Sequence, residues 1–278
     1  MTLGSACVVV ASGPAEWESV EAGWPNGRLE EWREIRPGRV VARMWFDSES
    51  EARDAVGEMR AAGHPAVLGP PDRQHEPSFA TRNRATVIGT RLAVCFPWTA
   101  VDEPVDRVVE IDPGTGFGTG SHPSTSLVLD ELCARDLSGL AVADIGCGSG
   151  VLAIAAVMRG ATSAVGIDIN VDGLDAARAN ALRNGVDGRV RFSAIPVEEF
   201  ADLGSSFDLV LANIHAPVLA EMADELTHLT SPGGSLVLSG LSIAQVSVLQ
   251  SRFDDFAFEA PARRDDWVSL VGQRRSSR

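Results

Sequence analysis

The chain has 278 residues, 45% of them hydrophobic and 22% charged, which is typical of a globular protein with one large or two modest domains. Its net charge of −14 argues against a general nucleic-acid binder, because phosphate contacts need clustered cations, and its lack of lysine excludes a Schiff base or a P-loop. No apolar run reaches the roughly 20 residues of a membrane span, and the four scattered cysteines lack metal-ligand spacing, so we expect a cytoplasmic protein without a metal site.

Residues 1–70 are predicted to form a small N-terminal α+β domain. Its clearest helix is Ser48–Ala62, which Ser48 can cap and Gly63 can end. Helical runs separate the strands, which are expected at Ala6–Ala11, Arg39–Phe46 and His64–Leu68. Strands and helices in this order indicate a ferredoxin-like sandwich.

Residues 71–107 are expected to form a linker and an extra strand. Three prolines and several polar residues between Gly69 and Arg84 are typical of a linker. The extra strand is expected at Thr86–Val94.

In the remaining region, residues 108–278, strands alternate with helices. Helices are expected at Val151–Arg159 and Gly173–Asn184. The strands are short apolar runs, expected at Ala141–Ile145, Ala164–Asp168, Arg189–Ser193, Leu209–Ala212 and Ser235–Ser239. This pattern predicts an α/β fold with a Rossmann-like parallel sheet that helices cover on both faces.

A glycine-rich loop with the sequence DIGCGSG begins at Asp144, at the end of the first of these strands. Open parallel sheets bind ligands at this end of their strands, and Gly146, Gly148 and Gly150 allow a ligand to approach the backbone. A dinucleotide-binding loop needs glycine at position 151, where this chain has valine, so the spacing favours S-adenosylmethionine. Asp144 could then accept a hydrogen bond from the cofactor's ammonium group.

Asp168 ends the following strand, 22 residues beyond Gly146. A carboxylate at this position can accept hydrogen bonds from both ribose hydroxyls, and the adjacent Ile169 can cover the adenine. Taken alone, Asp168 could equally be a turn residue, and NAD enzymes also place an acid here. The spacing of the glycine loop distinguishes the two cofactors.

The segment from Asp112 to Ser126, DPGTGFGTGSHPSTS, resembles the signature of the PrmA family, the methyltransferases of ribosomal protein L11. Further segments that look similar are the glycine loop, Gly166–Ile169, Leu211–Ile214, Leu238–Gly240 and Asp266 through Gly272. The resemblance covers about residues 108–275. It implies a methyltransferase that uses S-adenosylmethionine and adds methyl groups to lysine side chains and to an N-terminal amine.

The same resemblance implies roles for single residues and for the N-terminal domain. The family's cofactor contacts correspond here to Thr125, Gly146, Asp168 and Asn213, and the family's N-terminal domain grips the ribosomal protein. The sequence departs from the family on the substrate side. Phe79–Arg84 only faintly echoes an aromatic linker, and His215 stands where the family usually has an aliphatic residue.

Asn213 and His215 are the catalytic candidates. An amine acceptor must be neutral, and a dry pocket beside the positive sulfonium lowers its ordinary pKa of about 10.4. Asn213 is expected to orient the acceptor nitrogen through its side-chain oxygen, or else to form an Asx-turn that caps a helix at Pro217. His215 could accept the departing proton, or could be a packing residue or a helix cap.

Four other residues carry structural expectations. His122 is expected to shape a lid, and Thr125 can cap a helix at Ser126–Cys133. Trp98 and Trp267 are expected in the core.

Three readings of the function follow, in order of preference. The first is an amine methyltransferase acting on a ribosomal or other basic protein, and the second an N-methyltransferase acting on a small metabolite. The third is a non-catalytic S-adenosylmethionine-binding module. A nucleic-acid methyltransferase is disfavoured, because the chain is acidic and lacks the Asn-Pro-Pro-Tyr motif that stacks on a base.

Overall fold

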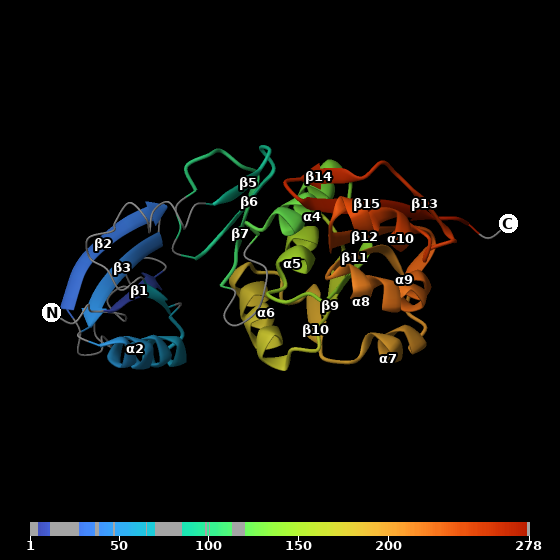
Figure 1. Cartoon of the computed structure of the whole chain (residues 1–278). Coiled ribbons are helices and arrows are strands. Elements are labelled where there is room, and N and C mark those ends of the chain that lie inside the picture. Colours follow the sequence, from blue (N-terminus) through green and yellow to red (C-terminus); the bar gives the residue numbers. More distant parts are fainter. Residues whose placement is uncertain are drawn as a thin grey trace. The chain divides into compact units, whose positions relative to one another are not determined.

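The structure is a computed structural model that describes residues 5–11, 28–36, 39–46, 48–64, 66–69, 85–97, 99, 101–112 and 120–276. Its elements are labelled in Figure 1. The chain forms two compact units, the N-terminal unit (Met1–Ala85 and Cys95–Pro104) and the C-terminal unit (Thr86–Val94 and Val105–Arg278). Within the described ranges, no helix is long and apolar enough to cross a membrane, and no group of His, Cys, Asp or Glu side chains is arranged to hold a metal ion.

The N-terminal unit contains a four-stranded antiparallel sheet in the order β2-β3-β1-β4. Its elements are β1 (Ser5–Ala11), β2 (Arg28–Arg36), β3 (Arg39–Phe46), α2 (Glu49–Ala61) and β4 (Ala66–Gly69). The predicted cap of α2 is confirmed, because the side chain of Ser48 accepts a hydrogen bond from the amide of Glu51 at 3.2 Å. Ala55 and Met59 of this helix are buried against Met44 of β3.

Strand β2 was missed in the sequence, where a helical run was expected between the first two strands. Its apolar residues Leu29, Trp32 and Ile35 recur every third position, which is closer to a helical period than to the alternation of a strand. Two register shifts in the pairing of β2 with β3 interrupt that alternation. Pairing with a neighbouring strand therefore decides the structure here.

The C-terminal unit is built on an eight-stranded sheet in the order β10-β9-β8-β11-β12-β15-β13, with β14 paired to β15. Its strands are β8 (Ala141–Ile145), β9 (Ser163–Ile167), β10 (Val190–Ser193), β11 (Phe207–Asn213), β12 (Thr230–Leu241), β13 (Phe256–Phe258), β14 (Ala262–Arg264) and β15 (Trp267–Arg274). The five strands from β10 to β12 are parallel, which confirms the Rossmann-like methyltransferase sheet. The strands β13, β14 and β15 were not predicted from the sequence, and they extend the sheet in antiparallel pairing.

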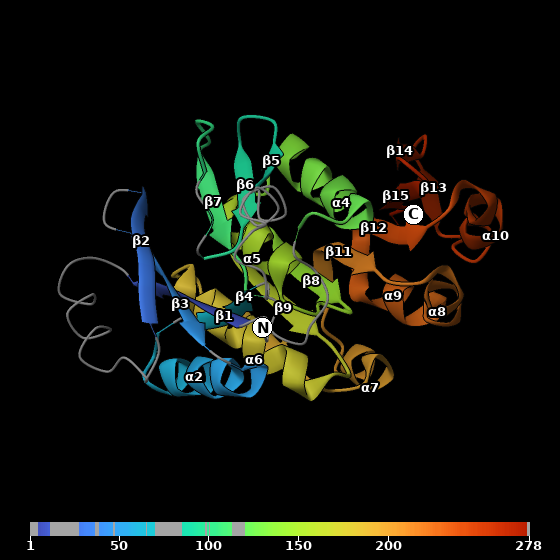
Figure 2. The same cartoon turned by 60° about the vertical axis from the view of Figure 1, so that its left-hand side comes forward.

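Helices cover both faces of this sheet (Figures 1 and 2). On one face lie α4 (Pro123–Ala134), α5 (Val151–Met158) and α6 (Val171–Arg183). On the other lie α7 (Val197–Asp202), α8 (Ala216–Glu221), α9 (Ala223–Leu229) and, after the short η1 (Ile243–Gln245), α10 (Val246–Gln250). Strand β11 divides the core, because Leu209 and Leu211 pack on one side while Val210 and Ala212 pack on the other.

A small sheet of β5 (Thr86–Ile88), β6 (Leu92–Cys95) and β7 (Arg107–Glu110) precedes the main one. The single strand predicted at Thr86–Val94 is wrong, because this run forms two strands. Gly89 has a φ of 55° and begins a turn in which the amide of Arg91 bonds the carbonyl of Ile88 at 3.2 Å, so the run folds back as a hairpin. Figure 2 shows these strands beside α4 and α5, and the core there includes Ile88 and Leu92.

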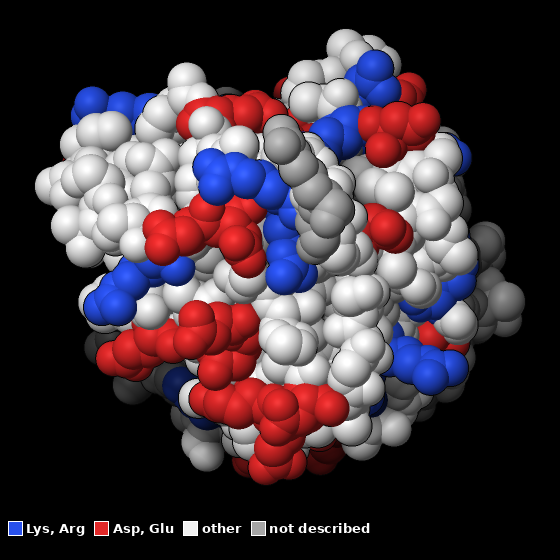
Figure 3. Space-filling model, turned by 90° about the vertical axis from the view of Figure 1, so that its right-hand side faces the viewer, with Lys and Arg blue, Asp and Glu red and all other residues white. Residues whose placement is uncertain are grey.

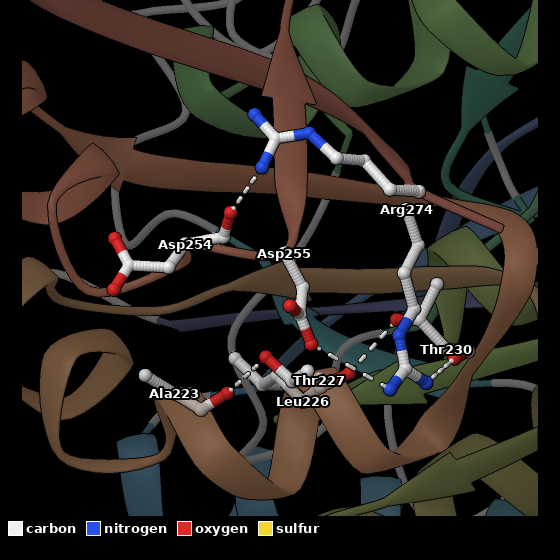
Figure 4. Close-up of polar contacts among 8 residues, drawn as sticks. Ala223, Leu226, Thr227, Thr230, Asp254, Asp255 and Arg274 are labelled. Carbon is white, nitrogen blue, oxygen red and sulfur yellow. Dashed lines mark hydrogen bonds and ion pairs between the residues drawn. The ribbon is translucent and has the colours of Figure 1, made fainter. Parts of the chain in front are cut away.

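Several elements are joined by side-chain contacts at the end of the sheet where the parallel strands begin (Figure 4). Arg274, at the end of β15, donates from Nη1 to the carbonyl of Thr230 at 2.5 Å, and its Nη2 lies 3.9 Å from Asp255 Oδ2. Thr230 Oγ1 in turn donates to the carbonyl of Leu226 at 2.8 Å. These contacts tie the antiparallel strand β15 to β12 and α9.

Candidate functional site

The candidate site lies where the strand order reverses, between β8 and its neighbour β11. In open α/β sheets this crevice at the C-terminal strand ends is the usual ligand site. A cavity of about 490 Å³ opens here. Six of the predicted site residues line it, namely Gly146, Gly148, Asp168, Ile169, Asn213 and His215. The other three, Thr125, Asp144 and Gly150, lie outside its lining.

The glycine loop between β8 and α5 is fixed by hydrogen bonds of its own backbone. The amides of Gly146 and Cys147 both donate to the carbonyl of Ile167 at the end of β9, at 2.8 and 3.1 Å. The amide of Gly150 donates to the carbonyl of Cys147 at 2.8 Å, which closes a turn. The loop therefore has a set shape before any ligand arrives.

Two glycines of this loop are required by the space around them. Gly146 has a φ of 73°, and a Cβ there would lie 2.4 Å from Ile214 Cγ2. Gly150 has a φ of 78°, and a Cβ there would lie 2.6 Å from the ring of Phe192. Gly146 thus keeps the cavity wall close to β11, whereas the surroundings of Gly150 are core side chains.

Asp168 stands at the rim of the cavity and holds the loop. Its Oδ2 accepts from the amide of Gly148 at 2.7 Å, and its Oδ1 accepts from the amide of Asn170 at 2.9 Å. Each carboxylate oxygen has a second lone pair. Asp168 can therefore bind a hydroxyl pair while it fixes the loop. The neighbouring Ile169 is 84% exposed, although it is a large apolar side chain that lines the cavity.

Asp144 is buried beneath the loop. Gly150 precedes α5 and has no side chain to cap it, and Asp144 Oδ2 accepts from the amide of Ala153 at 3.1 Å in its place. Oδ1 is buried with no hydrogen-bond partner among the described residues. Burial raises the pKa of Asp144 to about 7, the bond from Ala153 lowers it, and the charge of Asp168 raises it.

Asn213 and Thr125 meet although they are 88 residues apart in sequence. Asn213 Nδ2 donates to Thr125 Oγ1 at 3.1 Å, while Asn213 Oδ1 is buried without a partner in the described part of the chain. Thr125 therefore sets the orientation of the amide and leaves its oxygen as an acceptor. This arrangement differs from the alternative of an Asx-turn, because α8 is preceded by His215 and has no side-chain cap.

Helix α4 begins earlier than the sequence predicted. It begins at Pro123 rather than at position 126, since proline at the first helical position is already in helical conformation, and so Thr125 lies within the helix instead of capping it. The cap is His122, whose Nδ1 accepts from the amide of Ser124 at 3.3 Å. His122, expected to shape a lid, is a half-buried part of the cavity wall.

Several residues that line the cavity near Asn213 could not be recognised from the sequence. Trp267 was expected in the core, but it begins β15 at the cavity edge, half-buried, with its ring 4.7 Å from that of His122. Gly240 of β12 also lines the cavity, and a Cβ there would lie 2.4 Å from the carbonyl oxygen of Ile214. Val218 and Met222 complete this side. Trp98 lies outside the described residues.

His215, the last of the predicted site residues, and Cys147 of the glycine loop have simple surroundings. His215 is exposed at the cavity, and as the residue before α8 it makes no side-chain cap bond. Cys147 is buried, and a Cβ at Gly166 would lie 2.9 Å from its sulfur, which agrees with a small filler in the loop. Burial also raises the pKa of the Cys147 thiol, which disfavours a reactive thiolate.

Comparison with known proteins gives a consistent result. Residues 80–275 match the family described as ribosomal protein L11 methyltransferase (PrmA). The chain is 40% identical over 239 residues to the ribosomal protein L11 methyltransferase of Edwardsiella ictaluri, covering 83% of this chain and 80% of that protein. It is 44% identical over 240 residues to that of Serratia proteamaculans, with the same coverage of 83% and 80%.

A solved structure agrees with these relatives. The crystal structure of ribosomal protein L11 methylase from Lactobacillus delbrueckii subsp. bulgaricus is similar with a TM-score of 0.63 and 28% sequence identity. The similarity covers 69% of this chain and 99% of that one.

Proposed function

Because the chain belongs to the ribosomal protein L11 methyltransferase (PrmA) family and is an S-adenosylmethionine-dependent methyltransferase, we propose that it methylates amine nitrogens of ribosomal protein L11. The acceptors would be lysine side chains or an N-terminal amine. The observation that carries this proposal is Asn213, whose carbonyl oxygen is buried beside a largely apolar cavity at the switch point of the sheet and has no hydrogen-bond partner among the described residues.

The residues present fit the cofactor. S-adenosylmethionine supplies an activated methyl group on a sulfonium. The cavity of about 490 Å³ lies in the range of small-molecule sites. Asp168 has lone pairs to accept from the ribose hydroxyls, and Ile169 offers apolar surface to the adenine. Asp144 Oδ1, which no described residue bonds, suits an ammonium group, and such a bond would also offset the cost of burying the carboxylate.

The chain's own contribution to the reaction would be to orient the acceptor and exclude water. Asn213 Oδ1, held in place through Thr125, would accept a hydrogen bond from the acceptor nitrogen and aim its lone pair. The apolar side chains of Ile214, Val218 and Met222 would surround the acceptor and disfavour its charged form. The proton would be received by His215, which is exposed at the cavity, or by water, which competes with it there.

We propose that residues 1–70 form a ferredoxin-like domain that recognises the substrate protein, that residues 71–107 link it to the catalytic domain and include the hairpin of β5 and β6, and that residues 108–278 catalyse the reaction. The antiparallel order β2-β3-β1-β4 with α2 agrees with such a fold. A ribosomal substrate also agrees with the cytoplasmic location expected from the cysteines.

The surface charge supports a basic partner. Acidic side chains gather on the face of the C-terminal unit seen in Figure 3, the side on which α7 and α9 lie. The first turns of these helices carry Glu198, Glu199, Asp224 and Glu225. Such a surface would attract a basic protein and repel nucleic-acid phosphate.

Transfer of a labelled methyl group tests the proposal. The purified full-length enzyme and labelled S-adenosylmethionine are incubated with an extract from cells that lack the enzyme, with the Asn213→Ala variant as the control. We expect label in one protein band, which mass spectrometry identifies as ribosomal protein L11 carrying methylated amines. Label confined to small molecules would support the metabolite alternative, and binding of cofactor with no transfer to any fraction would support a binding module.

A further inference from the structure

Two asparagines of helix α6, one turn apart, bond the backbone at the end of β7 and just after it. Asn180 lies within the helix and Asn184 follows its last residue. Asn180 is fully buried, at 0% exposure. A buried amide is costly unless its hydrogen bonds are satisfied, so its partners indicate why it is there.

Every hydrogen-bonding position of the Asn180 amide is used. Nδ2 donates to the carbonyl of Asp112 at 2.9 Å and to the carbonyl of Ser149 at 3.0 Å. Oδ1 accepts from the amide of Asp112 at 2.9 Å and from Arg183 Nη1 at 2.6 Å. An amide has two donor hydrogens and two acceptor lone pairs, so no other side chain of this length can make all four bonds.

These partners belong to two separate parts of the site. Ser149 is in the glycine loop, and Asp112 is the first residue of the segment that leads to α4. That segment is held again at Gly120, whose carbonyl accepts from Ser126 Oγ at 3.0 Å, and it continues to His122 in the cavity wall. Asn180 thus joins the glycine loop to Asp112, which lies ten residues before His122 of the cavity wall.

We propose that Asn180 is a positioning residue for methyl transfer. It holds the glycine loop, at Ser149, and the backbone of Asp112 in one fixed arrangement. It touches neither the cavity nor the reacting atoms, and it acts through the Ser149 carbonyl. This inference rests on the proposed cofactor site at the glycine loop.

Asn184 provides a matched control within the same helix. Its Oδ1 accepts from the amide of Glu110 at 2.9 Å, and its Nδ2 donates to the carbonyls of Glu110 and Asn180, both at 2.8 Å. Asn184 therefore holds the last residue of β7 through its amide and carbonyl, as Asn180 holds Asp112 two residues later. Among the described contacts, Asn184 has no bond to the glycine loop. Loss of Asn184 reports on strand anchoring alone.

The test compares Asn180→Ser with Asn184→Ser in the full-length enzyme. We expect both to lower stability to denaturant, whereas only Asn180→Ser raises the Kd for S-adenosylhomocysteine and the KM for S-adenosylmethionine, each by about tenfold. Asn184→Ser should leave both within about twofold. Equal affinities in the two variants would overturn the proposal. Failure of the wild-type enzyme to bind S-adenosylhomocysteine would instead overturn the proposed cofactor site.

A measurement on the wild-type enzyme decides the matter even if Asn180→Ser does not fold. If Asn180 couples the loop to the segment, S-adenosylhomocysteine should slow hydrogen exchange of the Asp112 amide, which bonds Asn180 Oδ1 and lies outside the cavity lining. The Glu110 amide, held by Asn184, should change less. Exchange at Asp112 that is unaffected by the ligand contradicts the coupling.

Discussion

The two halves of the cavity are built in different ways. On the side proposed to hold the cofactor, the glycine loop and Asp168 come from two consecutive strand ends, and backbone amides bonded to Ile167 and Asp168 fix their shape. On the side proposed to hold the acceptor, the wall is assembled from side chains that are far apart in sequence, namely Asn213 of β11, His122 before α4, Val218 of α8 and Trp267 of β15. One half depends on local backbone geometry and the other on tertiary packing.

This difference has a consequence for substitutions. Changes on the cofactor side should alter binding and stability together, since the same groups that meet the ligand also hold the loop. Changes on the acceptor side should alter turnover with little effect on cofactor affinity. Four substitutions test whether the cavity divides in this way, and they follow from the largest expected effect to the smallest.

Asp144→Asn should have the largest effect, on stability rather than on turnover. The folded-state pKa of about 7 lies above the ordinary value of 3.8, so between about pH 4 and 7 the unfolded chain loses a proton that the folded chain keeps. Raising the pH through this window therefore destabilises the wild type, by roughly 4 kcal/mol at about 1.4 kcal/mol per pKa unit. Asparagine does not ionise, and it can still accept from the Ala153 amide.

The measurement is the free energy of unfolding by urea at pH 4.5 and pH 8 for both proteins. The difference between variant and wild type should grow in favour of the variant as the pH rises, and it should level off above about pH 7. Asp208→Asn, which removes an exposed carboxylate elsewhere on the sheet, is the control. A difference that does not change with pH would show that Asp144 is ionised throughout this window.

Asn213→Ala should lower kcat by about a hundredfold or more while the Kd for S-adenosylhomocysteine changes less than about threefold. The reason is that Asn213 Oδ1 is proposed to bind the acceptor nitrogen, whereas the family resemblance alone implied a cofactor contact for this residue. Thr125→Val is the matched variant, because it keeps the amide but removes the hydroxyl that orients it, and its kcat should fall by about tenfold. Both constants come from steady-state kinetics and calorimetry. A loss of cofactor affinity as large as the loss of turnover would place Asn213 on the cofactor side.

Asp168→Ala should weaken S-adenosylmethionine binding by about ten- to a hundredfold, since it removes charged hydrogen bonds to the ribose. The loop should also loosen, because the Gly148 amide loses its acceptor. Asp175→Ala, at an exposed position on α6, serves as the control. Calorimetry that finds the affinity of the Asp168 variant unchanged would refute the ribose assignment.

The same division explains what the sequence could predict. The loop from Asp144 to Gly150 and strand β8 were located correctly because their signals, glycine spacing and a continuous apolar run, are local. Trp267 and Gly240 were not recognised as site residues, because only the pairing of β15 with β12 brings them to the cavity. Asn180 was missed for a related reason. A buried polar residue in a helix has no sequence signature until its partners, here Asp112 and Ser149, are brought beside it.

His215 should have the smallest effect, and it tests whether the acceptor side contains a base at all. The side chain is exposed and makes no cap bond, so water can compete with it for the departing proton. We therefore expect His215→Ala and His215→Gln to lower kcat at pH 7.5 by only about two- to threefold, with the shape of the pH–rate profile retained. The decisive observation is the acidic limb in the pH–rate profile of kcat. If that limb is present in the wild type and lost in both variants, His215 is the base, and the acceptor side then contributes proton transfer as well as orientation. If the limb is retained, water receives the proton, and the acceptor side of the cavity acts through the geometry that Asn213 and Thr125 impose.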